Sequence, residues 1–475
     1  MLLVVLIRRL LHFSAVMRCG LTLWRGVPSD FRLLVGWLMG ASIVYALTWP
    51  THVLIADEVA YLTDALRWTA RPSACALGEW SGYAPGTSWL GAVLLRLTGR
   101  PTAVFGVGWL GCMVGLWVLG LLLRSWQRPV EWALYPALYL PGVVLSRAFM
   151  SDVASFGLAA AFLWGVAEPR VCRSRAFVAG MLGGLALLLR ETNLLWVSPF
   201  MIGALWRRRP HSAWLWAGFL AGALLRGVWA KVYFGNFFYV RDPQVAFSWT
   251  YLPTNLPFYA FMLTVLCPGG LFFLKNKKMP FWEETALATT AFLSVYGCYG
   301  YEAFAKSGVL KGLVLQGRFV LPLLPFLAFA GAFSEKIDLR RPVLRIAVVA
   351  ATAVLWVVVQ AGGYWYNRHQ QKVTDALLAL PTAVHWSASY DESRKYLNAL
   401  HTSACLLPLP QGEMPTVPAY VHLFTRSDSA DWQKKNAMAL SSLSRLLDRY
   451  RCRLLFDDTL PDGTRLRIWY LEARL

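Results

Sequence analysis

Two adjacent carboxylates, Asp57 and Glu58, lie a few residues after the first long apolar run of this chain. At membrane depth a charged side chain is costly unless it has a partner or a task. A helix through this point would place Asp57, Tyr61 and Asp64 on one stripe, at positions i, i+4 and i+7. Carboxylates at the edge of a membrane suit general-base catalysis or the binding of hydroxyl groups. The alternative is that both acids only mark the end of a transmembrane helix and lie in water.

Arginines near the ends of later apolar runs form a second group of candidates: Arg147, Arg190, Arg241 and Arg318, with a further carboxylate at Asp152. A guanidinium group can hold a phosphate through two parallel hydrogen bonds. Carboxylates and arginines together at the bilayer edge therefore predict a phosphate-bearing lipid and a hydroxyl acceptor as substrates.

Each arginine also has a structural alternative. Arg147 and Asp152 could form only an ion pair within their loop, and Arg190 could pair with its neighbour Glu191. Arg318 begins an apolar run, so its side chain could simply extend to the lipid headgroups. The sequence leaves these alternatives open.

Composition determines the kind of protein that must position these residues. Of 475 residues, 57% are hydrophobic and 15% are charged, and the mean hydropathy is +0.46. These values are typical of polytopic membrane proteins. The net charge of +20 does not indicate nucleic acid, because the basic residues fall in short clusters between apolar runs, as in a membrane-embedded chain.

About eleven apolar runs approach the roughly 20 residues that a transmembrane helix needs. They cover residues 33–49, 103–123, 132–145, 153–167, 177–189, 194–206, 213–230, 256–274, 285–299, 319–333 and 346–361. The run at 86–97 is short and carries Arg96, so we interpret it as a helix along the outer membrane surface. We therefore expect an all-α transmembrane domain over residues 1–365, with an outer loop at 50–102.

Charge distribution predicts which side each connection faces. With 86–97 excluded as a span, every second connection is basic, as is the segment before the first span. Basic connections face the cytoplasm. Residues 57–58, 147–152, 190–193, 233–257 and 300–318 then all lie on the outer side, as does the C-terminal region. Polar residues at the ends of distant spans thus converge on one face.

From Tyr366 onward transmembrane periodicity stops. Residues 373–380, 391–400 and 434–450 have helical patterns, and residues 464–470 alternate as a strand does. We expect residues 366–475 to form a small extracytoplasmic α/β domain. Cys405 and Cys452 would both lie there and could pair in an oxidising compartment or remain separate.

The sequence has no P-loop, no GxGxxG before a helix and no HExxH motif, so a soluble nucleotide has no visible site. No set of metal ligands is diagnostic.

Four short stretches, in this order, resemble one family. They are Asp57-Glu58-Val59-Ala60-Tyr61 (DE-x-x-Y), Ser146 to Asp152 with its arginine and aspartate, the LLLRETN of residues 187–193, and the R-F-x-x-P-x-x-P beginning at Arg318. Their order, sidedness and spacing over residues 30–335 resemble the GT-C superfamily of polytopic glycosyltransferases. The most similar group includes lipid A aminoarabinose transferase, the protein O-mannosyltransferases and the RgtA/B/C/D-like enzymes.

The resemblance implies transfer of a sugar from a polyprenyl phosphate to a hydroxyl of a glycan, lipid or protein, with inversion, at the outer face of the bacterial inner membrane. It implies Asp57 as general base, Glu58 and Asp152 as anchors for sugar or acceptor hydroxyls, and Arg190 and Arg318 as ligands of the lipid phosphate. Tyr61 and Arg147 belong to the matching motifs. The resemblance leaves a divalent metal open, since relatives differ.

One stretch departs from the family. Many relatives carry a basic residue before Pro-Pro-Leu at the start of the surface helix, whereas this chain has Tyr83-Ala84-Pro85-Gly86. Phosphate binding would then use other cations, with Arg241 and Lys311 as candidates, or the donor differs. Two other functions compete with the enzyme: a transporter or flippase of a lipid-linked saccharide, and a non-catalytic subunit of envelope glycan assembly.

Overall fold

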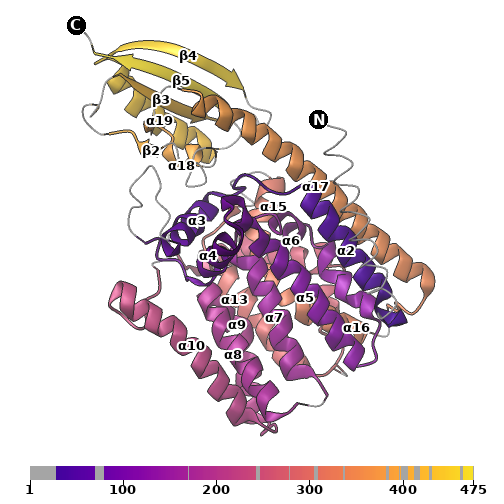
Figure 1. Cartoon of the computed structure of the whole chain (residues 1–475). Helices are drawn as coiled ribbons and strands as arrows, with labels where there is room; N and C mark the ends of the chain where they lie inside the picture. The colour runs from indigo at the N-terminus through magenta and orange to yellow at the C-terminus, as the bar shows by residue number, and fades with distance from the viewer. Residues whose placement is uncertain are drawn as a thin grey trace.

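The computed structural model combines a bundle of apolar helices with a small sheet domain above it (Figure 1). It describes residues 28–69, 80–169, 171–241, 246–277, 279–303, 309–334, 337–380, 384–394, 396, 405–410, 414, 418–426, 430–459 and 464–473. Several residues of the predicted basic clusters lie outside these ranges: Arg8, Arg9, Arg18, Arg25, Arg170, Lys278 and Lys336.

The bundle contains long helices and shorter helical pieces that continue them. The longer helices are α2 (Arg32–Leu47), α5 (Gly106–Ser125), α7 (Ser151–Ala167), α8 (Arg173–Leu189), α9 (Leu194–Trp206), α10 (Ser212–Phe234), α11 (Leu252–Phe261), α13 (Trp282–Gly297) and α17 (Pro342–Leu378). The shorter pieces are η1 (Ser29–Phe31), η2 (Pro101–Phe105), η3 (Val130–Leu138), α6 (Leu140–Leu145), η4 (Glu191–Asn193), η5 (Trp249–Tyr251), η6 (Met262–Leu266), α12 (Gly270–Phe273), α15 (Val309–Gly317), η7 (Arg318–Leu323) and α16 (Leu324–Ala332).

Helical structure lies over all eleven expected ranges. Within the described residues, four stretches are long and apolar enough to cross a membrane: Pro101–Ser125, Ser212–Phe234, Lys311–Ala332 and Pro342–Leu378. The fold is thus mostly helical and membrane-embedded, and the count of eleven spans stays a prediction. Two helices expected outside the membrane, α3 (Ala56–Trp68) and α4 (Gly86–Thr98), lie between the bundle and the sheet domain (Figure 1).

Glycines bring α8 and α10 unusually close. Gly180 and Gly184 on α8, and Gly218 and Gly222 on α10, each form a G-x-x-x-G pair. A Cβ on Gly180 would lie 1.8 Å from the carbonyl oxygen of Leu215, so only glycine permits this approach. Such small-residue faces associate helices in lipid, where no hydrophobic force does so. The contact fixes α10 at the edge of the bundle (Figure 1).

The C-terminal domain is a five-stranded sheet with strand order β2-β1-β3-β5-β4. Its strands are β1 (Val384–Ser387), β2 (Cys405–Pro408), β3 (Ala419–Thr425), β4 (Arg451–Thr459) and β5 (Arg465–Glu472), with helices α18 (Tyr390–Ser393) and α19 (Ala430–Leu447). β1 pairs in parallel with β2 and β3, whereas β5 pairs antiparallel with β3 and β4. Apolar residues of α19 pack on one face, and the end of α17 packs on the other. The expected α/β domain is therefore present as a small C-terminal sheet.

Two details differ from the sequence-based expectation. Residues 373–378 do not form a separate helix, because α17 continues without a break from Pro342 to Leu378 across the expected boundary at residue 366. In addition, Cys452 is free whereas Cys405 is disulfide-bonded, so these two cysteines do not pair. The disulfide partner of Cys405 lies outside the described residues.

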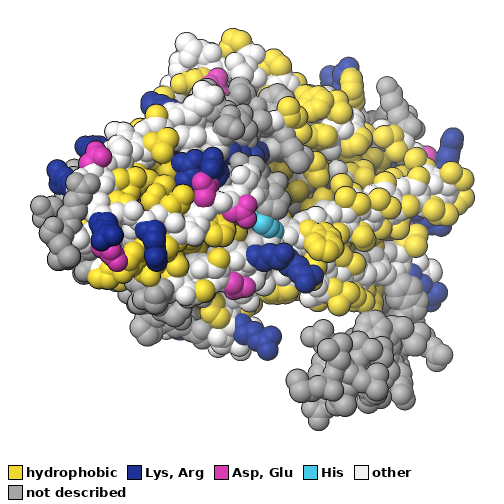
Figure 2. Space-filling model, turned by 90° about the horizontal axis from the view of Figure 1, so that it is seen from above, with side chains coloured by type: hydrophobic (Ala, Val, Ile, Leu, Met, Phe, Trp, Pro, Cys, Tyr) yellow, Lys and Arg dark blue, Asp and Glu magenta, His cyan; other side chains and the backbone are white. Residues whose placement is uncertain are grey.

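The two ends of α17 belong to different parts of the molecule. In the bundle, the Trp356 indole donates a hydrogen bond to the carbonyl oxygen of Ala41 on α2, at 3.1 Å. Near its C-terminal end, Val373 and Leu377 of the same helix enter the core of the C-terminal domain. Charged side chains gather on the half of the molecule that this domain covers, and hydrophobic ones dominate the half along α17 (Figure 2).

A buried histidine pair makes the C-terminal domain sensitive to acid. Burial, together with the neighbouring His385 ring, lowers the pKa of His422 to about 3. The folded domain therefore binds fewer protons than the unfolded chain below pH 6.5, and stability falls from pH 6.5 towards 3, by about 1.4 kcal/mol per pH unit. We expect the protection factors of β3 amides, in which the intrinsic pH dependence of exchange is divided out, to fall between pH 7 and pH 5, and His422→Gln to reduce this dependence. Equal protection factors of the wild type at both pH values would contradict the expectation.

Candidate active site

Asp57 and Arg318 form the first of two ion pairs at the end of the bundle where α3 and η7 begin. Asp57 is the second residue of α3, where the positive end of a helix favours a carboxylate. Both terminal nitrogens of Arg318, at the start of η7, lie 3.1 Å from Oδ2 of Asp57. The Arg318 side chain is 8% exposed and that of Asp57 is 36% exposed. Residues 261 positions apart thus meet, and the carboxylate can be reached from outside.

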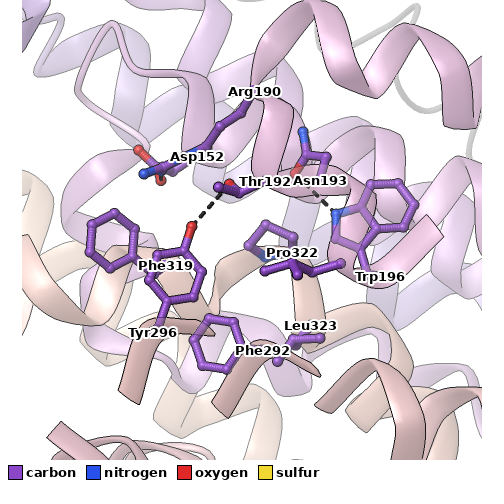
Figure 3. Close-up of a pocket in the computed structure, with 11 residues that line it drawn as sticks. Asp152, Arg190, Thr192, Asn193, Trp196, Phe292, Tyr296, Phe319, Pro322 and Leu323 are labelled. Atoms are coloured by element: carbon purple, nitrogen blue, oxygen red, sulfur yellow. Dashed lines mark hydrogen bonds and ion pairs between the residues drawn. The ribbon is translucent and has the colours of Figure 1, made fainter. Parts of the chain in front are cut away.

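The second ion pair joins Asp152, near the start of α7, to Arg190, directly after α8. Asp152 is 1% exposed, and its Oδ2 has no hydrogen-bond partner among the described residues. A cavity of about 20 Å³ lies beside the pair and is lined by both side chains and by Thr192, Asn193 and Trp196, among others (Figure 3). Such a volume accommodates about one water molecule and no sugar.

Phe319 brings the two guanidinium groups together. The Arg190 guanidinium lies 4.6 Å from the centre of this ring, and that of Arg318 lies 5.2 Å from it. Tyr296 stacks on the same ring at 4.5 Å and bonds through its hydroxyl to Thr192 at 2.9 Å (Figure 3). Two cations held against one ring create a region that attracts an anion with several oxygens.

Tyr61 and Arg241 connect to this region through Tyr83. The Tyr61 hydroxyl lies 3.2 Å from Oγ of Ser151, next to Asp152. Its ring packs on Tyr83 at 4.9 Å, and the Arg241 guanidinium lies 4.0 Å above Tyr83. Sequence reasoning named Tyr83 only as the start of the stretch that departs from the family and gave it no role in the site.

The electrostatic environment of Tyr83 places it beside the first ion pair. Burial raises the pKa of its hydroxyl, and the charge of Asp57 raises it further, whereas Arg241 and Arg318 lower it. One aromatic side chain therefore experiences the charges of three predicted site residues.

Glu58 has a different role from the one expected. It is fully buried, and its carboxylate accepts backbone N–H bonds from Leu54 (2.6 Å), Ile55 (2.7 Å) and Phe149 (2.7 Å). Burial raises its pKa to about 7, and the three N–H groups limit that rise. Its oxygens thus bind backbone N–H groups, and Glu58 ties the loop before Asp57 to the loop that contains Phe149.

We expect Glu58→Gln to loosen this connection, because an amide offers one acceptor oxygen where the carboxylate offers two. A buried N–H left without an acceptor costs about 1–3 kcal/mol. Hydrogen exchange at residues 54–58 and at Phe149 should accelerate at least tenfold. In Asp57→Asn, the control, exchange at these residues should stay as in the wild type.

Arg147 also differs from the prediction. Its guanidinium donates to the carbonyl oxygen of Thr48 at 2.7 Å and to Oε1 of Gln360 at 2.6 Å. It does not pair with Asp152, and a Cβ on Gly363 would lie 2.2 Å from its Nε. Arg147 therefore joins the end of α2 to α17.

Two further basic residues, Arg226 and Lys311, lie in different environments. Arg226, within α10, is buried and bonds to Glu191 at 2.7 Å. Glu191 thus pairs with Arg226, and the alternative that it pairs with Arg190 does not hold. A charged residue inside an apolar helix was the signal that could have identified Arg226. Lys311 lies in the first turn of α15 and is exposed.

The described part of the chain contains no group of three or more His, Cys, Asp or Glu residues placed to hold a metal ion.

Comparisons with known proteins complete the description. No family model and no curated protein matches this sequence. Among solved structures, ArnT from Cupriavidus metallidurans bound to undecaprenyl phosphate superimposes with a TM-score of 0.61 at 12% identity, covering 92% of this chain and 98% of ArnT. The apo form of the same ArnT gives a TM-score of 0.60 at 13% identity, with 93% and 98% covered.

The arabinosyltransferase EmbB from Mycobacterium smegmatis aligns at 13% identity over 74% of this chain and 42% of its own, with a TM-score of 0.33, too low to compare folds. The likeness to ArnT extends over nearly the whole of both chains. This chain therefore has the fold of ArnT.

Proposed function

We propose that this protein is a membrane glycosyltransferase that moves a sugar from a polyprenyl-phosphate donor to a hydroxyl acceptor at the extracytoplasmic face. The convergence of Asp57, Arg318, Asp152 and Arg190 carries the proposal, because four segments distant in sequence supply them to one rim of the bundle. The ArnT fold supports it, since the ArnT of that comparison was solved with undecaprenyl phosphate bound.

In the proposed reaction Asp57 is the general base. Its exposed carboxylate takes the proton of the acceptor hydroxyl as the hydroxyl oxygen forms a bond to the anomeric carbon. The bond between that carbon and the phosphate oxygen breaks at the same time, and the electron pair leaves with the polyprenyl phosphate. Attack from the side opposite the phosphate inverts the anomeric centre. A positioned base contributes about 10²–10⁴-fold to such a step.

The guanidinium groups of Arg190 and Arg318 supply the second requirement, stabilisation of the leaving phosphate. Cations fixed in advance stabilise developing negative charge without having to reorganise, and most strongly where water is scarce. Arg318 contacts both Asp57 and the Phe319 ring that Arg190 covers. The base and the phosphate ligands are thus adjacent, as a reaction across one anomeric carbon requires.

Arg241 is a better candidate than Lys311 for the role of the basic residue that relatives carry before the surface helix. It stacks on Tyr83, three residues before that helix begins at Gly86. Asp152, held by Arg190, would act as an anchor within the site.

Two observations support an extracytoplasmic site. Basic connections predict the opposite side as cytoplasmic. Cys405, in the domain above the site, is disulfide-bonded, and disulfides persist in oxidising compartments.

Mass spectrometry of lipid-linked and surface glycans in a deletion strain tests the proposal. We expect one sugar residue to disappear from the glycan or lipid and its polyprenyl-phosphate form to accumulate. Purified protein in liposomes should then transfer that sugar from the accumulated donor. Movement of labelled donor across the bilayer without a new glycosidic bond would instead identify a flippase. An unchanged glycan profile, or loss restored by protein that lacks transfer activity, would also contradict the proposal.

A further inference from the structure

The C-terminal half of α17 carries a buried polar stripe that the proposed reaction does not use. Gln360, Gln370 and Thr374 are each fully buried, although α17 also exposes side chains along this length. Buried polar groups of this kind need partners. Gln370 and Thr374 have partners in the segment that leads from α2 to Asp57, and Gln360 reaches that segment through Arg147.

Gln360 and Gln370 hold two points of that segment. Gln360 bonds to Arg147, which in turn donates to the carbonyl oxygen of Thr48. Gln370 donates to the carbonyl oxygen of Val53 at 3.1 Å. The backbone is therefore connected to α17 at Thr48, through Arg147, and directly at Val53, both in the segment before α3.

Thr374 links the same segment to the C-terminal domain. Its hydroxyl lies 2.8 Å from the carbonyl oxygen of Tyr396 and 3.2 Å from Nε2 of His52. A carbonyl can only accept, so the hydroxyl donates to Tyr396 and accepts from His52 Nε2–H. Nδ1 of His52 then accepts from the Thr51 hydroxyl at 2.9 Å. One consistent set of donors and acceptors joins the loop, α17 and the domain.

Few backbone residues between these contacts and Asp57 are left without a hydrogen bond that fixes their position. Glu58 takes the N–H groups of Leu54 and Ile55, and Asp57 follows two residues later. Beside Thr374, Val373 and Leu377 pack in the core of the C-terminal domain, within one turn of it on α17. The loop before Asp57 and the sheet domain thus share a few turns of one helix.

We propose that Thr374 and Gln370 are positioning residues for Asp57, so that the C-terminal domain sets the geometry of the catalytic base through α17. This inference rests on the proposed function. The reason to expect an effect on rate is geometric: a displacement of about 1 Å at a reacting group can lower the rate about 10²-fold. Loss of one hydrogen bond among the many that hold this chain is too small to unfold it.

Two pairs of variants separate positioning from stability. Thr374→Val removes the hydroxyl and keeps the shape, whereas Thr374→Ser keeps the hydroxyl. Gln370→Met removes the donor to Val53, and Gln371→Met is its control, because the exposed Gln371 bonds, among the described residues, to Asp375 on its own helix at 2.6 Å. We expect Thr374→Val and Gln370→Met to lower kcat about tenfold, with the KM for donor and the melting temperature within their wild-type ranges.

Thr374→Ser and Gln371→Met should retain kcat within about twofold of the wild type, well inside the tenfold effect expected from misplacement. Wild-type kcat in Thr374→Val and Gln370→Met would overturn the inference, as would equal losses in the two Thr374 variants or a loss that follows the melting temperature. These outcomes are distinct from failure of the proposed function, in which the wild type itself transfers no sugar or Asp57→Asn remains fully active.

Discussion

Asp57→Asn is expected to lower the rate of sugar transfer by about 10²–10⁴-fold, the usual contribution of a general base. Asparagine has nearly the same shape, and its carbonyl oxygen can still accept from Arg318, so the outer loop should keep its structure. It cannot take a proton from the acceptor hydroxyl. The measurement is kcat for transfer from labelled donor in liposomes, together with donor binding, which should stay near wild type.

Asp375→Asn provides the matched control, since Asp375 is an exposed carboxylate on the outer part of α17. It should transfer at the wild-type rate. If Asp57→Asn transfers as fast as that control, Asp57 is not the base.

Arg318→Gln is expected to lower transfer by about 10²–10³-fold, the effect of removing one preorganised group that stabilises developing charge. Unlike Asp57→Asn, it should also weaken donor binding, because Arg318 is proposed to hold the phosphate. Arg318→Lys should lie between wild type and Arg318→Gln, since lysine keeps the charge but loses the paired nitrogens and the planar group over Phe319. Transfer rate and affinity for polyprenyl phosphate measure the two effects.

The double variant Asp57→Asn with Arg318→Gln should lose less than the sum of the single effects, because the two side chains are in contact. Arg100→Gln, an exposed arginine of the outer loop, is the control for charge loss alone. Unaltered donor binding in Arg318→Gln would remove Arg318 from the phosphate site.

Hydrophobic runs and basic clusters were sufficient to predict that Asp57, Asp152, Arg190 and Arg318 meet. In a membrane each apolar run must cross or lie along the bilayer. The order of the runs, together with the basic clusters, therefore predicts the side that each connection faces. Four outer connections of one compact bundle then have little room to avoid each other. This constraint explains why short motifs were informative despite their length.

Side-chain direction was the part that the sequence could not provide. Asp57 and Glu58 are neighbours on a helix, so their side chains point about 100° apart. Asp57 faces the site and Glu58 faces the protein interior. Nothing in the sequence distinguishes the directions of these two adjacent acids. Asp152 raises the same problem: Arg147 is nearer in sequence, yet Arg190 reaches it across the helix interface.

Tyr83 and the length of α17 were missed for a different reason. Tyr83 lies in a loop, where neither periodicity nor spacing distinguishes a residue. Its importance becomes visible only in the structure, where the Arg241 guanidinium lies over its ring. The outer part of α17 is polar on its exposed side, so the end of the apolar pattern at Tyr366 concealed a helix that continues to Leu378.

The unbroken course of α17 restricts how this chain can change. Trp356, bonded to α2, and Thr374, bonded to His52, are 374 − 356 = 18 residues apart, or about five full turns, so both face the same way. Inserting or deleting a single residue between them would rotate one anchor by about 100° away from its partner. The number of residues between Trp356 and Thr374 is therefore constrained. The loops of the C-terminal domain can lengthen or shorten without rotating one end of α17 relative to the other.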